Sequence, residues 1–503
     1  MKRKIAKILL TQPNYSWEEK RTWTSPPYTL CLIKACLGKQ YETIVFDPNF
    51  YNLSKEEVIK CLKEFKPDLM GVTSISTEYI NASKKLNAIL REALPDSIIV
   101  LGGIIPTVVI DEAMKDKNVD YWIMGEGEES FPALIEEVQQ ENPDFSKISG
   151  LAFWQDDKKV INRMTFIENL DSIPFPDYSN IVGNLGGKKL AISDYGNQRL
   201  KYAPNLLARN YPFALTLTSR GCPYNCVFCA GATVTGKKVR LRSAENVLAE
   251  IDELYKQGIR EVIFPDDHFL ASKKRAMDIM GGILQRGITW KCVNVTAWFL
   301  DKEVLDLMYK SGCNFLAISV ESGNPHVVKN IIKKPVNLEK IPEICSYAKS
   351  LGFDIIANFV IGFPGETWEQ IRDSFRYGEK LDVDIVNFHI ATPLPKTELM
   401  DICIREGLLP DDFESNLSKY SGFGKGLIMT KDFTPFELEV IRSFEWDRIN
   451  FSSEKRKEAV MRMNGLTREE LENWRVNTRR NLGVNSRVAN IVRSHKQTSE
   501  SES

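Results

Sequence analysis

The sequence predicts an α/β protein with two domains built on parallel sheets, followed by a small helical region. Short apolar runs alternate with amphipathic helical patterns between residues 5 and 140, and the alternation restarts at Phe213. Uniformly apolar strands separated by helices are typical of a parallel sheet that helices cover on both faces. A chain of 503 residues is also too long for one ordinary core, so more than one domain is expected.

The first domain is expected to be a doubly wound, flavodoxin-like sheet. Its predicted strands are 8–10, 43–46, 69–73, 98–101 and 121–124, and its clearest helical patterns are 55–65, 80–94 and 132–138. Sheets of this kind bind ligands at the carboxyl ends of their strands. Small polar residues and glycines stand at those ends, which makes this edge of the sheet a candidate ligand site.

The second domain is expected to be a partial parallel barrel of six strand–helix units. The predicted strands are 214–218, 261–264, 292–297, 315–320, 355–361 and 385–390, and the helices between them are 244–257, 274–285, 302–309, 338–351 and 368–380. Barrels of parallel strands carry their chemistry at the carboxyl ends of the strands. The polar clusters of this half of the chain fall at those ends.

These patterns predict the domain boundaries. The first domain takes residues 1–144 and the barrel takes 213–410, and an irregular linker of residues 145–212 joins them, with a candidate hairpin across Asp156-Asp157 and a stiff proline-rich stretch at 173–177. Helical patterns at 435–449, 453–463 and 468–481 indicate a C-terminal helical region, 411–486, that closes the barrel or shapes the substrate pocket. The polar end, 487–503, is expected to be disordered.

Composition limits the partners and the compartment. The formal net charge is −1, which gives no global reason to expect nucleic acid or an anionic membrane surface as a partner. No apolar run approaches the length of a membrane span, and the apolar stretch after the basic N-terminus is too short for a signal peptide. Ten cysteines in such a chain suit a reducing compartment, so we expect a cytoplasmic protein.

A run of three cysteines is the most informative motif in the chain. Cys222, Cys226 and Cys229 follow a CxxxCxxC spacing, with an aromatic residue directly before the last cysteine. Three thiolates from one loop leave one iron of a 4Fe–4S cluster open to a small molecule. A zinc site would need further ligands, and the only nearby histidine is His268. A disulfide framework is unusual in a long chain without a secretory signal, and a ferredoxin-type cluster would need a fourth cysteine.

The spacing resembles the radical S-adenosylmethionine (SAM) superfamily, and the strand ends downstream match that family in order. The resemblance implies that one of Asp266 and Asp267 receives the ammonium of SAM. It further implies SAM contacts to the ribose, carboxylate and adenine from Glu321, Ser322, Asn358, Ile361, Gly362 and Pro393. Each of these segments alone is better explained as an ordinary loop with a helix cap. Their order behind the cysteine motif is what favours the family.

The first domain resembles the cobalamin-binding domain that precedes many radical SAM modules. The matching strand-end residues are Ser74, Ser76, Thr77, Gly102, Gly103, Gly125 and Gly127, and Pro26-Pro27 stands before the first helix. Ordinary strand–helix turns also carry such residues, so the match depends on the set. The first histidine of the chain is His268, so this domain has no imidazole for the lower face of cobalt. That face would be empty, bound to water, or ligated by another group.

The resemblance implies an enzyme that cleaves SAM reductively and abstracts hydrogen from an unactivated carbon. The leading hypothesis is a cobalamin-dependent C-methyltransferase acting on a small-molecule or natural-product substrate, with an external electron donor such as a flavodoxin or ferredoxin. The alternative keeps both cofactors but catalyses oxidative cyclisation or rearrangement without net methylation. A vestigial first domain without cobalamin and a redox or scaffold protein with a cluster are the remaining hypotheses.

Four residues near the strand ends keep open roles. Arg240 and Arg242 follow the cysteine loop and can pair with carboxylates of SAM or substrate, or with surface acids. His268 and His389 lie at strand ends, where a proton-donating role and a structural role are both reasonable.

Overall fold

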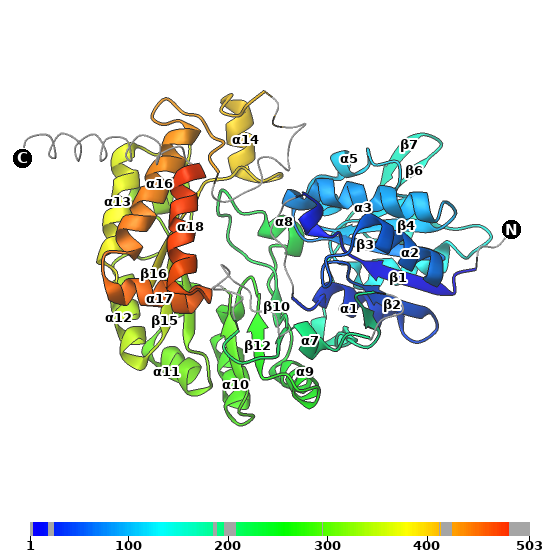
Figure 1. Cartoon of the computed structure of the whole chain (residues 1–503), viewed down its shortest axis with the longest axis horizontal. Coiled ribbons are helices and arrows are strands. Elements are labelled where there is room, and N and C mark those ends of the chain that lie inside the picture. The colour runs from blue at the N-terminus through cyan, green and yellow to red at the C-terminus, as the bar shows by residue number, and fades with distance from the viewer. Residues whose placement is uncertain are drawn as a thin grey trace, which may run out of the picture.

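A computed structural model describes residues 4–18, 25–184, 189–195, 208–293, 295–411, 413 and 425–481. The first domain and the barrel lie side by side, with β10 (Ser219–Arg220) and α8 (Gly231–Thr235) between them (Figure 1). Buried apolar side chains of the two domains form one continuous cluster that includes Leu10, Tyr178 and Ala214. None of the described helices is both long enough and apolar enough to cross a membrane. The predicted disordered end, 487–503, lies outside the described residues.

The first domain has the flavodoxin-like strand order that the sequence predicts. Its parallel strands are β1 (Lys7–Thr11), β2 (Glu42–Phe46), β3 (Leu69–Ser74), β4 (Ile98–Gly103) and β5 (Tyr121–Ile123). They are arranged in the order β5-β4-β3-β1-β2. The helices of this domain are α1 (Tyr28–Leu37), α2 (Lys55–Phe65), α3 (Ile80–Ala93), α4 (Ile104–Val108), α5 (Ile110–Ala113) and α6 (Gly127–Glu137).

Helix α6 begins five residues before the predicted start at residue 132, inside the Gly-Glu-Gly-Glu segment. Glu128 and Glu129 occupy its first turn, where carboxylates interact favourably with the positive end of the helix dipole. Pro132 therefore lies within the helix and does not start it.

Parts of the expected linker belong to the first sheet. The candidate hairpin forms as β6 (Leu151–Gln155) and β7 (Lys158–Ile161), and β6 pairs antiparallel with β5. At the opposite edge, β8 (Ile181–Val182) pairs with β2. The sheet thus has eight strands, and it continues past residue 144.

The second domain is a partial barrel made of two three-stranded parallel sheets. One contains β9 (Phe213–Leu215), β12 (Glu261–Phe264) and β13 (Thr289–Cys292), and the other contains β14 (Phe315–Glu321), β15 (Asp354–Ile361) and β16 (Ile385–Ile390). A bridge between Val295 and Ile318 joins them. The surrounding helices are α9 (Ala244–Lys256), α10 (Lys273–Leu284), α11 (Lys302–Lys310), α12 (Ile341–Leu351), α13 (Trp368–Lys380) and α14 (Glu398–Arg405).

The third barrel strand starts earlier than predicted. The sequence predicts a strand over 292–297, whereas β13 covers Thr289–Cys292. Trp290 is fully buried in an aromatic group with Phe264 and Phe269, and this packing places the strand around it.

The C-terminal region closes the open edge of the barrel. It consists of α16 (Pro435–Asn450), α17 (Glu454–Asn464) and α18 (Arg468–Asn481), and α16 packs on β16. The buried side chain of Asn450 accepts from the Val386 amide and donates to the Val386 carbonyl, both at 2.8 Å. Arg442 donates to the Phe388 carbonyl at 2.6 Å. Side chains of α16 therefore satisfy edge-strand groups that a further strand would otherwise bind.

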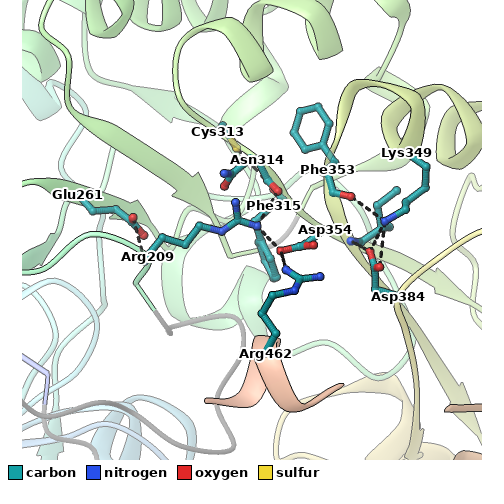
Figure 2. Close-up of polar contacts among 11 residues, drawn as sticks. Arg209, Glu261, Cys313, Asn314, Phe315, Lys349, Phe353, Asp354, Asp384 and Arg462 are labelled. Atoms are coloured by element: carbon teal, nitrogen blue, oxygen red, sulfur yellow. Dashed lines mark hydrogen bonds and ion pairs between the residues drawn. The ribbon is translucent and has the colours of Figure 1, made fainter. Parts of the chain in front are cut away.

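Charged pairs close the amino ends of the barrel strands (Figure 2). Asp354, the first residue of β15, accepts from both Arg209 and Arg462. Asp384, just before β16, accepts from Lys349 at 2.8 and 2.9 Å. Because Arg209 precedes β9 and Arg462 belongs to α17, this network ties the start of the barrel and the C-terminal region to the same strand.

Candidate functional site

The three cysteines lie on a loop that leaves and re-enters a short antiparallel ribbon. Strand β10 pairs with β11 (Arg240–Leu241), and Arg220 stands opposite Arg240 in this ribbon. Gly221 has a φ of +93°, and a Cβ there would lie 2.3 Å from the Lys238 carbonyl oxygen. The amide of Cys222 donates to the Gly236 carbonyl at 3.1 Å. Only glycine fits this tight exit from the ribbon.

The three thiols of this loop differ in exposure. Cys222 and Cys226 are half-buried and Cys229 is exposed. Burial raises the pKa of all three thiols, that of Cys226 to about 12. No three metal-binding side chains of the described residues converge on one point. Binding of a cluster would require these thiols to lose their protons, which burial opposes.

The two aspartates after β12 have different surroundings. Asp266 is buried and accepts from the Thr218 amide at 2.7 Å and from the Ser219 hydroxyl at 2.8 Å. Its hydrogen bonds hold the start of the ribbon. Asp267 is exposed, accepts from the Gly221 amide at 3.1 Å, and lines the cavity described below. Of the two carboxylates, Asp267 is the one that a ligand can reach.

A buried ion pair lies behind the cysteines. Glu321 ends β14 with a φ of +69° and pairs with Lys334. Burial alone would lower the pKa of Lys334. The negative charge of Glu321, with a smaller contribution from the cysteines, outweighs burial and raises this pKa. Sequence reasoning did not single out Lys334, because a lysine beside a turn carries no motif of its own.

The other predicted SAM contacts follow the same strand ends. The Ser322 hydroxyl is buried and lies 3.1 Å from that of Ser374 on α13. Asn358 is half-buried on β15 and accepts from Asn387 at 3.3 Å, whereas Ile361 and Pro393 are buried. Gly362 has a φ of +86°, and a Cβ there would lie 2.5 Å from a Leu438 methyl group.

Glu366 is a further buried group that the motif did not predict. Its Oε2 accepts from the amides of Gly362 and Phe363 at 2.7 and 3.1 Å. Its Oε1 has no hydrogen-bond partner among the described residues. Burial raises the pKa of Glu366 to about 7, although the two amides oppose this shift.

One cavity lies between the carboxyl edge of the first sheet and the barrel. It contains about 1120 Å³ of space, including its opening to solvent. The first domain contributes four predicted glycines: Gly102, Gly103, Gly125 and Gly127. The second domain contributes Leu217, Thr235, Pro265 and Asp267. The candidate ligand edges of both domains therefore face the same space.

The hydroxyl residues predicted for this edge lie outside the cavity wall. Ser74 is buried and links β3 to β4, because its hydroxyl donates to the Gly102 carbonyl and accepts from the Ile105 amide. Ser76 accepts from the Glu78 amide as a helix cap, and Thr77 is buried. The structure thus brings together the glycines of the prediction and gives the hydroxyl groups local structural partners.

The cavity wall fits a corrin. The four glycines of this wall carry no side chains, so a ligand can approach the backbone closely there. Apolar residues cover another part of the wall: Leu10, Val100, Ile123 and Phe131. No histidine is among the described residues that line it.

Two glutamates of the first domain bind the two arginines of the ribbon. Glu126 contacts Arg240 at 2.7 Å and Arg220 at 3.1 Å, and Glu128 pairs with Arg220. All four side chains are at least 89% buried, since their exposed fractions run from 2 to 11%. Burial opposes ionisation of Glu126, but the two arginines outweigh it and lower its pKa. We call these four residues the domain clamp.

The sequence left the arginine partners open, and the structure assigns them. Arg240 pairs with Glu126 of the first domain, whereas Arg242 pairs with the buried Glu250 of α9. Neither pairs with a surface acid. The acids of the Gly-Glu-Gly-Glu segment were the available signal for the clamp, but sequence reasoning used only its glycines.

Burial disfavours the protonated form of both histidines at strand ends. Burial lowers the pKa of His268, and burial together with Arg442 lowers that of His389 to about 4. The His268 ring packs against Phe299 and Tyr224, with centroids 4.9 and 5.8 Å apart.

Comparisons with protein families match both domains. Residues 21–135 match the B12 binding domain, and residues 216–378 match the Radical SAM superfamily.

Individual relatives extend this match across the domain boundary. An uncharacterized methyltransferase of Pyrococcus horikoshii is 31% identical over 414 residues, which cover 81% of this chain and 85% of the relative. A cytidylyl-2-hydroxyethylphosphonate methyltransferase of Streptomyces wedmorensis is 29% identical, with 75% and 74% covered. Among solved structures, the radical SAM methyltransferase TsrM of Kitasatospora setae, with cobalamin and a 4Fe–4S cluster bound, shares the fold with a TM-score of 0.66. Its sequence identity is 19%, and 80% of this chain and 78% of that one are covered.

Proposed function

Because this chain belongs to the family of radical SAM proteins with an N-terminal cobalamin-binding domain, we propose that it transfers a methyl group from SAM to a carbon of a small-molecule substrate. The observation that carries this proposal is the shared cavity, which is lined by the cobalamin-side glycines and by Pro265 and Asp267 of the barrel. A methyl carrier in that space would face the mouth of the barrel. The methyltransferases among the relatives support the same reaction.

The residues of this chain hold and orient the reactants. Cys222, Cys226 and Cys229 would hold the 4Fe–4S cluster, and Asp267 would receive the ammonium of SAM. Lys334 offers a buried cation beside the thiols, where it can balance their charge or bind a carboxylate. The bound cofactors supply the reductive cleavage of SAM and the transfer of methyl through cobalt.

The remaining predicted contacts have supporting positions. Glu321 ends β14 and Gly362 directly follows β15, so both stand at carboxyl strand ends where SAM would bind, whereas Asn358 lies within β15. Ser322, Ile361 and Pro393 are buried, so they would act through the shape of their turns. Burial disfavours the protonated form of His268 and His389, which argues against the proton-donating role that the sequence left open for them. An acidic one-electron carrier such as a flavodoxin or ferredoxin is the proposed electron donor.

The test is anaerobic reconstitution followed by two measurements. Protein loaded with iron, sulfide and cobalamin is gel-filtered, and its absorption spectrum reports the cobalamin that it retains. It is then incubated with a reductant and SAM that carries a labelled methyl group. The proposal predicts retained cobalamin, release of 5′-deoxyadenosine, and label on cobalamin. Release of 5′-deoxyadenosine without label on cobalamin would contradict methyl transfer and would favour cyclisation or rearrangement.

A further inference from the structure

The domain clamp joins the two ligand-binding edges of the molecule. Glu126 and Glu128 alternate along the chain with Gly125 and Gly127, which line the cavity. A ligand bound in the cavity would therefore lie against the segment that carries both glutamates.

The other half of the clamp frames the cysteine loop. Arg220 and Arg240 stand opposite each other in the ribbon, and the whole loop from residue 221 to residue 239 runs between them. Arg220 is separated from Cys222 by a single glycine. Arg240 also donates to the Thr235 carbonyl at 2.7 Å, so it holds the end of the loop as well as its return strand. The guanidinium groups fix both ends of the loop.

Burial makes the clamp a stiff connection. A buried charge that loses its partner is left without solvation, so the pairs cannot separate without a large cost. The planar guanidinium groups also fix direction as well as distance. The Ile167 amide donates to Glu126 at 2.7 Å and its carbonyl accepts from Arg240 at 2.6 Å, which leaves the central pair little freedom to shift.

We propose that the domain clamp couples cobalamin binding in the cavity to cluster loading of the cysteine loop, with Glu128 and Arg220 as positioning residues. Each ligand fixes the loop at its own end of the clamp, and the stiff clamp carries that constraint to the loop at the other end. The second ligand then binds a structure that is already ordered, which makes the two binding events mutually favourable. This inference rests on the cobalamin site of the proposed function and adds that the two cofactor sites depend on each other.

The experiment is a binding cycle with hydroxocobalamin as the probe. Its dissociation constant is measured by anaerobic titration for cluster-loaded and cluster-free protein, in the natural chain and in Glu128→Gln and Arg220→Lys. We expect the natural chain to bind cobalamin at least about fivefold more tightly when the cluster is present, the lower end of typical coupling. In both variants that ratio should fall toward one. Arg220→Lys keeps the positive charge but removes the planar guanidinium group, so it tests the geometry of the clamp even if Glu128→Gln is unstable.

A matched control and a spectroscopic measurement separate positioning from general destabilisation. Asp252→Asn breaks the ion pair with Arg286, which is more exposed than the clamp and is not part of the cavity lining, and it should leave the ratio unchanged. The electron paramagnetic resonance spectrum of the reduced cluster should change on cobalamin addition in the natural chain and not in the clamp variants. A ratio of one in the natural chain, or an unchanged ratio in both variants, overturns the coupling. Absence of cobalamin binding in either form would instead overturn the proposed function together with the coupling.

Discussion

Several charged and polar groups at the two ends of the barrel have different surroundings. At the amino ends of the strands, Asp354 meets two arginines, and Asp384 meets Lys349 and also accepts from the Ile355 amide (Figure 2). At the carboxyl ends, Asp267 is exposed, the thiols remain accessible, and Glu366 keeps one buried oxygen without a partner among the described residues. Of these groups, those that can still bind a ligand lie at the carboxyl ends.

This difference separates stability from chemistry. Paired charges at the amino ends join Arg209, β15 and α17, so they hold the barrel closed. Polar groups without a hydrogen-bond partner at the carboxyl ends lower the stability of the fold unless a ligand binds to them. Variants at the two ends should therefore differ in kind as well as in size: loss of a cofactor-binding group at the carboxyl ends should impair cofactor chemistry, and loss of a paired charge at the amino ends should impair folding.

The largest effect is expected for Cys226→Ala. Loss of one thiolate leaves too few ligands for the cluster, so 5′-deoxyadenosine formation should fall to background while the melting temperature of cluster-free protein stays close to that of the natural chain. Iron and sulfide content and chromatography of the products measure this. Cys36→Ala is the matched control, because Cys36 is equally half-buried but lies in the first domain. Retained cluster in Cys226→Ala would remove this cysteine from the site.

Lys334→Met should have the next largest effect. It leaves Glu321 buried without its cation and removes positive charge beside the thiols. We expect 5′-deoxyadenosine formation to fall about 10- to 100-fold, as for other groups that support metal ligands. Lys333→Met is the control, because its pair with Glu398 is exposed. Equal effects of the two substitutions would show that the buried pair has no special role.

Glu366→Gln tests the cost of the unsatisfied carboxyl. The folded-state pKa of about 7 lies above the usual value of 4.5, so the native state binds more protons between these values and stability is lost as pH rises through them. The amide cannot ionise, so the variant should gain stability relative to the natural chain from pH 5 to pH 8, by at most about 3 kcal/mol. Melting curves across this range measure the gain. Glu369→Gln, an exposed neighbour, should show no such rise, and a flat difference for Glu366→Gln would refute the assignment.

The smallest effect is expected at the amino ends, from Asp354→Asn. It weakens two charge-assisted hydrogen bonds, but both arginines are partly exposed and stay solvated. We expect a loss of about 2 kcal/mol in stability, with cluster content and cobalamin retention unchanged. Asp252→Asn is again the control and should cost less than about 1 kcal/mol. A drop in cofactor content at equal folded fraction would contradict the separation between the two ends.

Sequence patterns were sufficient for the features that depend on neighbouring residues. The cysteine spacing lies within one loop, and the strand–helix alternation appears in windows of about a dozen residues. They predicted the doubly wound sheet, the partial barrel and the three C-terminal helices. The start of α6 was missed because Gly-Glu-Gly-Glu is typical of a turn, although its acids also suit a first helical turn.

Features that join distant parts of the chain needed the folded structure. Glu128 and Arg220 are 92 positions apart, and Val386 and Asn450 are 64 apart. No local pattern predicts which acid pairs with which arginine. Nor does any predict that the side-chain amide of a helix residue will bond to the edge strand in place of a further strand. Asp266 and Asp267 are adjacent and chemically alike. Asp266 is nevertheless buried in hydrogen bonds to the start of the ribbon, whereas Asp267 lines the cavity. The spacing of a motif is a property of the chain, whereas the partner of a buried charge depends on which surfaces exclude water together, and that is decided only when the two domains pack.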